Sequence, residues 1–449
     1  MLRPTFRDPA GSVVIQADRV LRLLSEQGAA ELDAFLQTHI PTSFAGRIVA
    51  TWPAAGRAVE HPKIWFTSYP YEWPAEMLHS AGALTLDLAR AALKEGWQLK
   101  DATPYNVLYD GAEPVFVDVC SFERRNSRSP IWQAYGQFAR NFLNPLMAHK
   151  ILHQPTGPLF FAHRDGLDAE ELYRWVPALR RWLPPLLFAV TIPALLSTSR
   201  RKPAKPAECS PDEAAYVLGR LLNSAESRLN QLEPAIEDSR WTGYMSTFTY
   251  SAQQFEFKSA FVKKAIEKLQ PKRTLDIGCN TGHFSRLAAK AGSRVVGMDS
   301  DPAVVGRLWR EAKRDKLDIQ PLVGDFARPS PATGWRNAEC LGLTSRFEQA
   351  DFGLTLVLGT LHHLMVTDRI QPTELLEQLA AITKHAVVEY IGPEDEMFQY
   401  LARGNERLYA HVTPGWFENL VRDYFRIIDS AAVPGSSRRL YLLTSAQPS

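Results

Sequence analysis

A short apolar run that ends in a glycine-rich turn constrains the fold of this chain more than any other stretch. Residues 274–277 (TLDI) have the composition of a buried strand, and Gly278 and Gly282 bracket the tight turn that follows. From His283 onward the apolar residues recur at helical spacing. A strand, a glycine turn and a helix together open a nucleotide-binding βαβ unit, because the turn lets a ligand approach the backbone and the helix N-terminus offers free N–H groups.

The acidic residue inside this strand indicates a cationic ligand rather than a pyrophosphate. Asp276, Gly278, Asn280 and Gly282 are spaced differently from the dinucleotide pattern G-x-G-x-x-G. The stretch resembles the first motif of the class I S-adenosylmethionine-dependent methyltransferases, with Asn280 in place of the middle glycine. The resemblance implies that these four residues bind S-adenosylmethionine, which carries an ammonium and a sulfonium and no phosphate.

Two later segments are similar to companion motifs of that family. Strand 293–298 leads to Asp299, at roughly 20 residues past the first turn, where the resemblance implies a carboxylate that accepts the ribose hydroxyls. Strand 319–323 leads to Asp325 and Phe326. By the same resemblance Asp325 takes the adenine amino group and Phe326 lies near the adenine ring.

A fourth strand, 352–358, leads to a Gly-Thr-Leu-His-His step that is frequent in these methyltransferases. Thr360 is therefore a cofactor contact by resemblance. His362 and His363 are candidate general bases, since ligands bind at the carboxyl ends of such strands and a base works best with a pKa near neutrality. A purely positional role for either histidine remains open. The resemblance covers about residues 250–447, and a Rossmann-like domain that binds another nucleotide, or none, is the alternative.

The C-terminal half predicts an α/β fold, a Rossmann-like seven-stranded methyltransferase sheet with helices on both faces. Strands and helices alternate from residue 273, and the segments 425–430 and 440–444 form a closing hairpin. The N-terminal half is expected to be an α+β accessory domain. Residues 17–37 have helical spacing there. Two helices are also expected within 211–270: the first begins at a capping pattern at 210–213 and has an apolar face that reaches Leu229, and the second covers about 253–269.

Composition limits which classes of partner and which cellular compartment we expect for this chain. The net charge of +2 over 449 residues gives no electrostatic reason to expect a nucleic-acid partner. The four cysteines lie far apart and form no C-x-x-C pair, which is typical of reduced cytosolic thiols and gives no zinc pattern, so no metal is expected. We therefore expect a cytoplasmic protein with a small-molecule, carbohydrate or lipid acceptor.

One apolar segment raises the question of a membrane. Residues 182–196 are apolar and precede a basic cluster at 200–202, but prolines interrupt the run and it is shorter than the roughly 20 residues that span a bilayer. No transmembrane segment is predicted. A buried or interfacial segment is expected, and peripheral membrane contact remains open.

A second pattern occupies residues 62–126. Asp101, Asn106 and Asp118 resemble the catalytic loop and metal-binding aspartate of the kinase and aminoglycoside-phosphotransferase fold. Leu99 stands where that family usually has histidine, and no glycine-rich phosphate loop precedes it. Three interpretations stay open: an inactive kinase-like remnant, ordinary turn chemistry of Asp and Asn, and a working phosphotransferase.

The expected domains are an N-terminal accessory domain at 1–200, a proline-rich linker at 201–211, and a methyltransferase domain at 212–449 with a helical lead-in at 212–270. The combination also resembles nodulation-type methyltransferases, which implies a sugar or lipid-linked sugar as acceptor. The expected function is S-adenosylmethionine-dependent methyl transfer. The alternatives are a non-catalytic S-adenosylmethionine-binding regulator and a phosphotransferase that uses the N-terminal segment.

Overall fold

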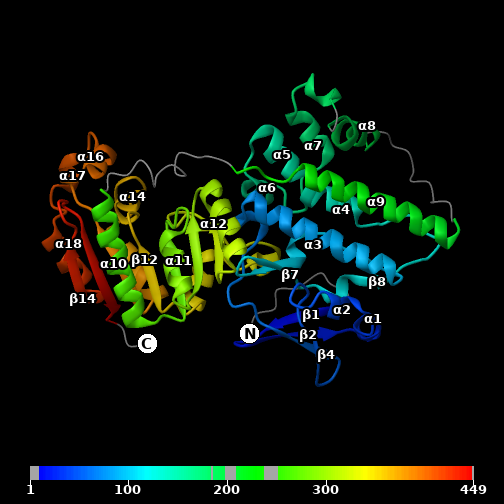
Figure 1. Cartoon of the computed structure of the whole chain (residues 1–449), viewed down its shortest axis with the longest axis horizontal. Coiled ribbons are helices and arrows are strands. Elements are labelled where there is room, and N and C mark those ends of the chain that lie inside the picture. The colour runs from blue at the N-terminus through cyan, green and yellow to red at the C-terminus, as the bar shows by residue number, and fades with distance from the viewer. Residues whose placement is uncertain (1–9, 184–185, 198–208, 237–250, 447–449) are drawn as a thin grey trace. The chain divides into compact units, whose positions relative to one another are not determined.

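The computed structural model describes residues 10–183, 186–197, 209–236 and 251–446. The chain divides into two compact units (Figure 1). The first unit is Met1–Ala235 together with Gly334–Cys340, and the second is Ile236–Thr333 together with Leu341–Ser449. Most of the expected linker, residues 201–208, lies outside the described residues, as does the basic cluster at 200–202.

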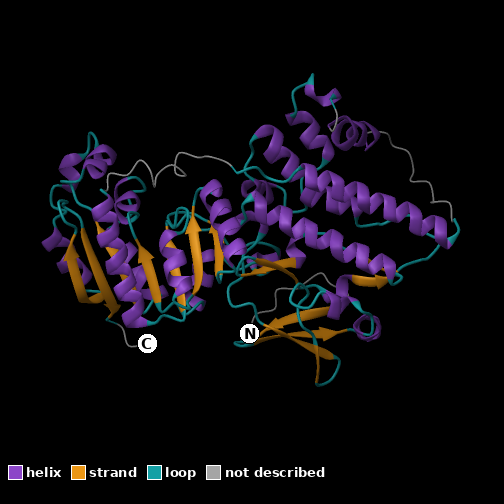
Figure 2. Ribbon diagram, viewed as in Figure 1, coloured by secondary structure: helices purple, strands orange, loops and turns teal. Residues whose placement is uncertain are grey.

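The second unit is built on the seven-stranded sheet that the sequence predicts (Figure 2). Its order is β11-β10-β9-β12-β13-β15-β14, with β15 antiparallel to both neighbours and the other pairings parallel. The central strands β9, β10, β12 and β13 are almost entirely buried, because helices cover both of their faces. The strands are β9 Arg273–Ile277, β10 Arg294–Asp299, β11 Ile319–Val323, β12 Leu354–Val357, β13 His385–Tyr390, β14 Phe425–Ala432 and β15 Arg439–Ser445.

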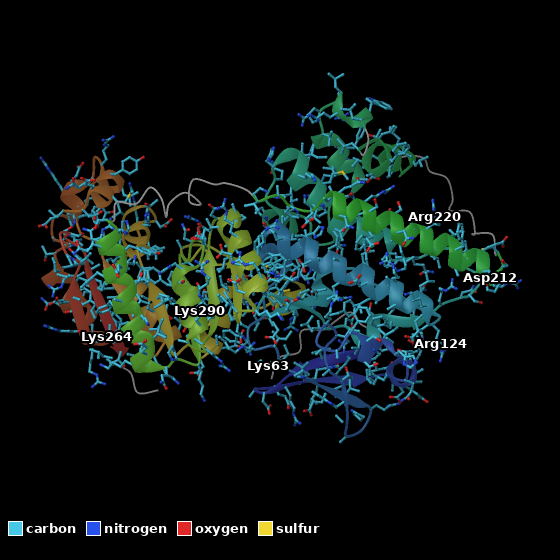
Figure 3. The ribbon with its side chains drawn as sticks, in the orientation of Figure 1. Lys63, Arg124, Asp212, Arg220, Lys264 and Lys290 are labelled. Atoms are coloured by element: carbon cyan, nitrogen blue, oxygen red, sulfur yellow. The ribbon has the colours of Figure 1, made fainter. Side chains whose placement is uncertain are left out.

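Helices alternate with these strands. The helix α10 packs on α11, which packs on β9 and β10. On the outer side of α10, Lys264 (labelled in Figure 3) pairs with Asp429 of β14 at 3.0 Å. The helices of this half are α10 Ala252–Leu269, α11 His283–Lys290, α12 Pro302–Asp315, α13 Leu343–Gln349, α14 Leu361–Val366, α15 Pro372–Ile382, α16 Glu396–Ala402, α17 Glu406–Tyr409 and α18 Pro414–Val421.

The first unit combines small sheets with helices, as expected of an α+β domain. A four-stranded antiparallel sheet has the order β1-β2-β4-β3, and β5 pairs with β8 and β6 with β7. The strands are β1 Gly11–Ile15, β2 Arg19–Leu24, β3 Trp52–Ala54, β4 Ala58–Pro62, β5 Trp97–Leu99, β6 Val107–Asp110, β7 Glu113–Phe116 and β8 Phe122–Arg124. The α-helices are α1 Glu26–Leu36, α2 Ile40–Ser43, α3 Ala75–Lys94, α4 Tyr135–Phe138, α5 Asn144–Leu152, α6 Thr156–Ala162, α7 Ala169–Trp175, α8 Ile192–Ser197 and α9 Pro211–Gln231. Short 3-10 turns η1 Pro70–Glu72, η2 Pro104–Asn106, η3 Val119–Ser121 and η5 Arg180–Trp182, and π-helical turns η4 Ala139–Leu143 and η6 Leu187–Thr191, join them.

Two expectations for the N-terminal half differ from the structure. The helix expected at 17–37 is divided, because residues 19–24 form β2 between β1 and β4 and only residues 26–36 are helical. The helix expected to begin at 210–213 forms as α9, with a Ser210–Glu213 capping box. It packs against α3 within the first unit, however, so the unit boundary falls near residue 235 and not at 201–211.

A loop of the C-terminal half contributes to the first unit. Residues 334–340, which include η7 Trp335–Asn337, cluster with that unit, whereas the flanking residues on both sides cluster with the second. Within the first unit Glu339 pairs with Arg164 at 2.5 Å. The chain therefore passes between the units three times.

The apolar segment 182–196 does not form one long helix. Within its described part, η6 and α8 are short, Val190 is buried and Phe188 is exposed. Across the described residues, no helix combines the length and the apolar character needed to span a bilayer.

Candidate active site

A cavity of about 310 Å³ lies at the carboxyl ends of β9, β10, β11 and β12, within the second unit. This is the edge of a doubly wound sheet at which ligands bind, and the volume lies within the range of small-molecule sites. Eight of the ten residues proposed from the sequence line it: Asp276, Gly278, Asn280, Asp299, Asp325, Phe326, Thr360 and His363. Gly282 and His362 are not part of the lining.

The turn after β9 has the backbone that its sequence favours. Gly278 and Asn280 have φ of +72° and +49°, a conformation that glycine and asparagine tolerate best. A Cβ on Gly278 would lie 2.3 Å from the Oγ1 of Thr360, whose hydroxyl donates to the Ile277 carbonyl at 3.1 Å. Gly278 therefore lets the loop after β12 close against the turn.

Gly282 has a packing role. Its φ is +78°, and a Cβ there would lie 2.3 Å from the Cδ1 of Leu308 in α12. The glycine thus lets α11 and α12 approach each other closely, and it does not line the cavity. This agrees with the third-glycine role in dinucleotide turns, where the residue serves packing rather than ligand contact.

Asp276 lies at the base of the cavity and is almost fully buried. The Ser285 hydroxyl donates to its carboxylate at 2.6 Å. Burial raises the pKa of Asp276 to about 6, although the Ser285 hydrogen bond and the charge of Lys258 oppose the shift. The carboxylate is therefore poised to respond to a cation that enters the cavity.

Asp299 ends β10 and anchors the glycine turn. Its Oδ2 accepts the backbone N–H of Asn280 at 2.9 Å, and its Oδ1 accepts that of Asp301 at 3.0 Å. Burial raises its pKa, and these hydrogen bonds oppose that shift. Each carboxylate oxygen keeps acceptor capacity for a further donor, which suits a pair of ligand hydroxyls.

The loops after β11 and after α14 meet through an arginine. Arg328 pairs with Asp325 at 2.8 Å and with Asp368 at 3.0 Å, and all three residues line the cavity. Asp325 also accepts the backbone N–H of Ala327 at 2.8 Å. Phe326 contributes an apolar wall beside this polar cluster.

The two adjacent histidines differ in their surroundings. His363 lines the cavity, whereas His362 is 3% exposed and neither of its ring nitrogens has a hydrogen-bond partner among the described residues. Burial, reinforced by His363 and nearby cations, holds the pKa of His362 well below its ordinary value. Burial thus favours the neutral form of His362, and of the two only His363 lines the cavity.

Sequence reasoning missed Lys258, which lies on α10 and lines the cavity. Its Nζ is 2.7 Å from the Oε2 of Glu389 at the end of β13, and both side chains are buried. The Nζ also lies 5.3 Å from the centre of the Phe284 ring. A signal was present: Lys258 falls at helical spacing with the buried Val262 and Ala265, on the apolar face of the helix.

The polar groups of the cavity fit S-adenosylmethionine. Three carboxylates near the ends of successive strands line the cavity: Asp276, Asp299 and Asp325. The turn after β9 also lines it, and that turn has no room for a Cβ at Gly278. This set suits a ligand with ammonium and sulfonium charges and hydroxyl donors. It suits a polyphosphate poorly, because phosphate oxygens would face these carboxylates.

Of the three residues that resemble a kinase site, the fold places two at one cavity. Asn106 and Asp118 line a separate cavity of about 420 Å³ in the first unit, and Asp101 does not. Asp118 pairs with the buried Arg22 at 2.9 Å. The carboxylate that the resemblance assigns to magnesium is therefore already neutralised by an arginine.

The same cavity contains a buried histidine. His61 has Nδ1 at 3.1 Å from the Ala50 carbonyl, which favours a proton on Nδ1, and its Nε2 has no hydrogen-bond partner among the described residues. Burial lowers the pKa of His61 to about 4, and Arg22 adds to this shift. His61 therefore presents a neutral acceptor nitrogen.

Comparison with known proteins gives one family and several relatives. A family model described as "Methyltransferase domain" matches residues 250–424. The chain is 28% identical to "Nodulation protein NoeA" of Rhizobium meliloti over 97% of this chain and 94% of that protein. It is 23% identical to the Escherichia coli "O-antigen chain terminator bifunctional methyltransferase/kinase WbdD" over 29% of this chain and 16% of the relative.

Solved structures give weaker matches. A crystal structure of WbdD matches at 17% identity with a TM-score of 0.30, covering 45% of this chain and 42% of that one. The N-methyltransferase NodS from Bradyrhizobium japonicum, in complex with S-adenosyl-L-homocysteine, matches at 15% identity with a TM-score of 0.33, covering 44% and 90%.

Proposed function

The C-terminal part of this chain is a methyltransferase domain, and we propose that it transfers a methyl group from S-adenosylmethionine to a small-molecule, carbohydrate or lipid acceptor. One observation carries the cofactor assignment. Three carboxylates line one cavity at the carboxyl edge of the sheet: Asp276 near the end of β9, Asp299 at the end of β10 and Asp325 just after β11.

We propose a role for each lining residue that the sequence indicated as a cofactor contact. Asp299 accepts the ribose hydroxyls, and Asp325 with Phe326 holds the adenine. Asn280 and Thr360 shape the turn against which the ligand lies, with Gly278 between them. Buried Asp276 stabilises the ligand's positive charge, and its bond from Ser285 leaves the carboxylate with further acceptor capacity.

The bound cofactor would supply a methyl group activated by its sulfonium. The chain's own contribution is to hold an acceptor atom at near-attack distance, roughly 3–3.5 Å from that carbon, and to exclude water. His363 is the candidate to remove a proton from the acceptor, because it faces the cavity and His362 does not. Glu389 is a weaker candidate, because Lys258 pairs with it.

The acceptor class rests on sequence and relatives. The Gly-Thr-Leu-His step after β12 replaces the Asn-Pro-Pro-Tyr pattern of amino-group methylation, and the net charge of +2 gives nucleic acid no general attraction. The relative that spans almost the whole chain is named for nodulation, and the name of another refers to an O-antigen chain. Together they favour a carbohydrate or lipid-linked carbohydrate.

Calorimetric titration of the full chain with S-adenosylmethionine tests the proposal. We expect saturable one-to-one binding that Asp299→Ala weakens while the fold stays intact. Asp423→Asn, a change at an exposed carboxylate of the same unit, is the control and should bind like the parent. Equal affinity in Asp299→Ala would contradict the ribose assignment, and absence of binding to the parent would contradict the cofactor assignment.

Two alternatives predict different results. A non-catalytic regulator would bind S-adenosylmethionine without methylating any acceptor, so transfer of labelled methyl to a sugar or lipid-linked sugar excludes it. A phosphotransferase is favoured only by the joint position of Asn106 and Asp118 at one cavity, and the Arg22–Asp118 pair opposes it. That alternative requires magnesium-dependent ATP binding that Asp118→Ala abolishes.

A further inference from the structure

The end of α7, the turn η5 and the helices η6 and α8 expose an unusual number of large apolar side chains. Leu179 is 88% exposed, Trp182 59% and Phe188 57%. Trp175, Leu183 and Ile192 are exposed as well. Together these six residues are called the 175–192 apolar surface. Single exposed apolar residues are ordinary, but a group of this size within one short segment marks an interaction site.

The segment is nevertheless folded. Helix α7 contacts η6 and α8, and η5 contacts η6, so these elements form one packed cluster at an edge of the first unit (Figure 1). Leu186, Val190 and Thr191 are buried inside it. Arg181 donates to the Val176 carbonyl at 2.8 Å and lies over the Tyr173 ring, which fixes the turn. The exposed residues are therefore held outward by a structure that has its own small core.

The charge of the segment is one-sided. Residues 172–197 contain three arginines, Arg174, Arg180 and Arg181, and no aspartate or glutamate. Arg174 and Arg180 are exposed among the apolar side chains. Tryptophan and arginine beside aliphatic residues is the composition of surfaces that lie in the headgroup region of a bilayer, where indole rings and cations both find partners.

We propose that the 175–192 apolar surface binds peripherally to a membrane that carries anionic lipids. Trp182, Leu183 and Phe188 insert into the interface, and Arg174 and Arg180 contact lipid phosphates. The surface lies on the bilayer and does not cross it, since no helix in the described ranges is long and apolar enough to span. The proposal does not depend on methyl transfer, because the surface belongs to the first unit and the cofactor cavity to the second.

Vesicle flotation with the full chain tests it. We expect the protein to float with phosphatidylcholine vesicles that contain phosphatidylglycerol, more weakly with phosphatidylcholine alone, and less well as salt increases. Trp182→Ser with Phe188→Ser should weaken binding by about tenfold or more, because two large apolar side chains lose their burial. Arg174→Gln with Arg180→Gln should remove the preference for the anionic lipid.

A matched control comes from the second unit. Tyr400 and Leu408 are 58% and 63% exposed, so Tyr400→Ser with Leu408→Ser removes comparable apolar area elsewhere and should leave flotation unchanged. Circular dichroism and calorimetry with S-adenosylmethionine check that each variant is folded. Absence of flotation with either vesicle overturns the proposal, as does equal loss in the control variant. A dimer in light scattering that Trp182→Ser with Phe188→Ser dissociates, without vesicle binding, would also overturn it and assign the surface to a second copy of the chain.

Discussion

The Nζ of Lys258 lies 2.7 Å from the Oε2 of Glu389, and this buried ion pair joins α10 to the end of β13 beside the candidate cofactor cavity. Lys258 is 5% exposed and Glu389 is fully buried. Two charges out of water are tolerated only because each neutralises the other. The pair therefore couples the position of the lead-in helix to the wall of the cavity.

Removing one member of that pair should destabilise the second unit. We expect Lys258→Met to lower the free energy of unfolding by about 3–5 kcal/mol, because the buried carboxylate of Glu389 would lose the cation that lies 2.7 Å from it. Lys258→Met combined with Glu389→Leu should recover much of the loss. Chemical denaturation of the full chain, followed through the transition of the second unit, measures these changes.

The exposed ion pair between Lys264, on the same helix, and Asp429 of β14 provides the control. Lys264→Met should cost at most about 1 kcal/mol, since exposed ion pairs contribute little. Equal effects of Lys258→Met and Lys264→Met would mean that burial does not decide the strength of the inner pair.

Alanine at Gly278 should damage the cofactor site more than the fold. Its Cβ would lie 2.3 Å from the Thr360 Oγ1 at a φ of +72°, so the turn or the loop after β12 must move. We expect the affinity for S-adenosylmethionine to fall by about tenfold or more, as a displacement of this size disturbs several contacts at once. Calorimetry gives the measurement.

Gly404→Ala measures the effect of a positive φ in the absence of a steric clash at Cβ. Gly404 has a similar φ of +82°, but nothing lies within 4 Å of its Cβ position. This variant should lose some stability and keep its affinity. If Gly278→Ala and Gly404→Ala bind equally, the close approach of Gly278 to Thr360 has no part in binding.

Binding of the cofactor should weaken in acid. The pKa of Asp276 is raised to about 6, so this carboxylate is ionised at pH 7.5 and increasingly protonated below pH 6. A cationic ligand favours the ionised form, and the affinity should fall by up to about tenfold at pH 5, one unit below that pKa. Calorimetry of the parent and of Asp276→Asn across this range is the test, and the variant should show a flatter profile.

His362 should make the second unit sensitive to acid in a different way. Its folded-state pKa lies well below the ordinary value, so the unfolded chain binds the proton more readily. The stability that depends on neutral His362 is present above about pH 6.5 and is lost progressively as the pH falls below that value. His362→Leu should remove this loss, since a buried polar ring without partners is replaced by an apolar side chain.

Thermal unfolding of parent and variant above and below about pH 6.5 measures the difference. His411, an exposed histidine of the same unit, supplies the control, and His411→Leu should leave the pH dependence unchanged. A parent-like acid response in His362→Leu would show that other groups cause it.

Periodicity predicted the second unit well because its strands are short, apolar and separated by amphipathic helices. The strands β9, β10, β11, β12, β14 and β15 fall within a few residues of their expected bounds. The first unit was harder. Residues 19–24 alternate only weakly, and their pairing with β1 and β4 overrides the helical spacing of 17–37. Long-range pairing of this kind leaves no trace in a local window.

In the candidate site, too, some residues could be predicted from local sequence patterns and others could not. The cavity residues beside the turns could be found by motif, because each follows a strand in a fixed order. Lys258 needed a different argument, that a lysine on the apolar face of a helix must have a buried partner. Glu389 could not be assigned to it from sequence, since 131 residues separate the two. His362 looked equivalent to His363, and only burial distinguishes them.

Three passages of the chain between the two units limit how the protein can be dissected. A fragment that ends near residue 235 would lack Glu339 and leave Arg164 without that carboxylate, and Cys340 would be missing from the wall of the larger cavity. The complementary fragment would carry residues 334–340 away from the surroundings in which they are folded. If each fragment folds poorly by itself, the separation of residues 334–340 from the first unit is a sufficient reason. Loss of activity after the chain is cut would therefore say little about which half performs the chemistry.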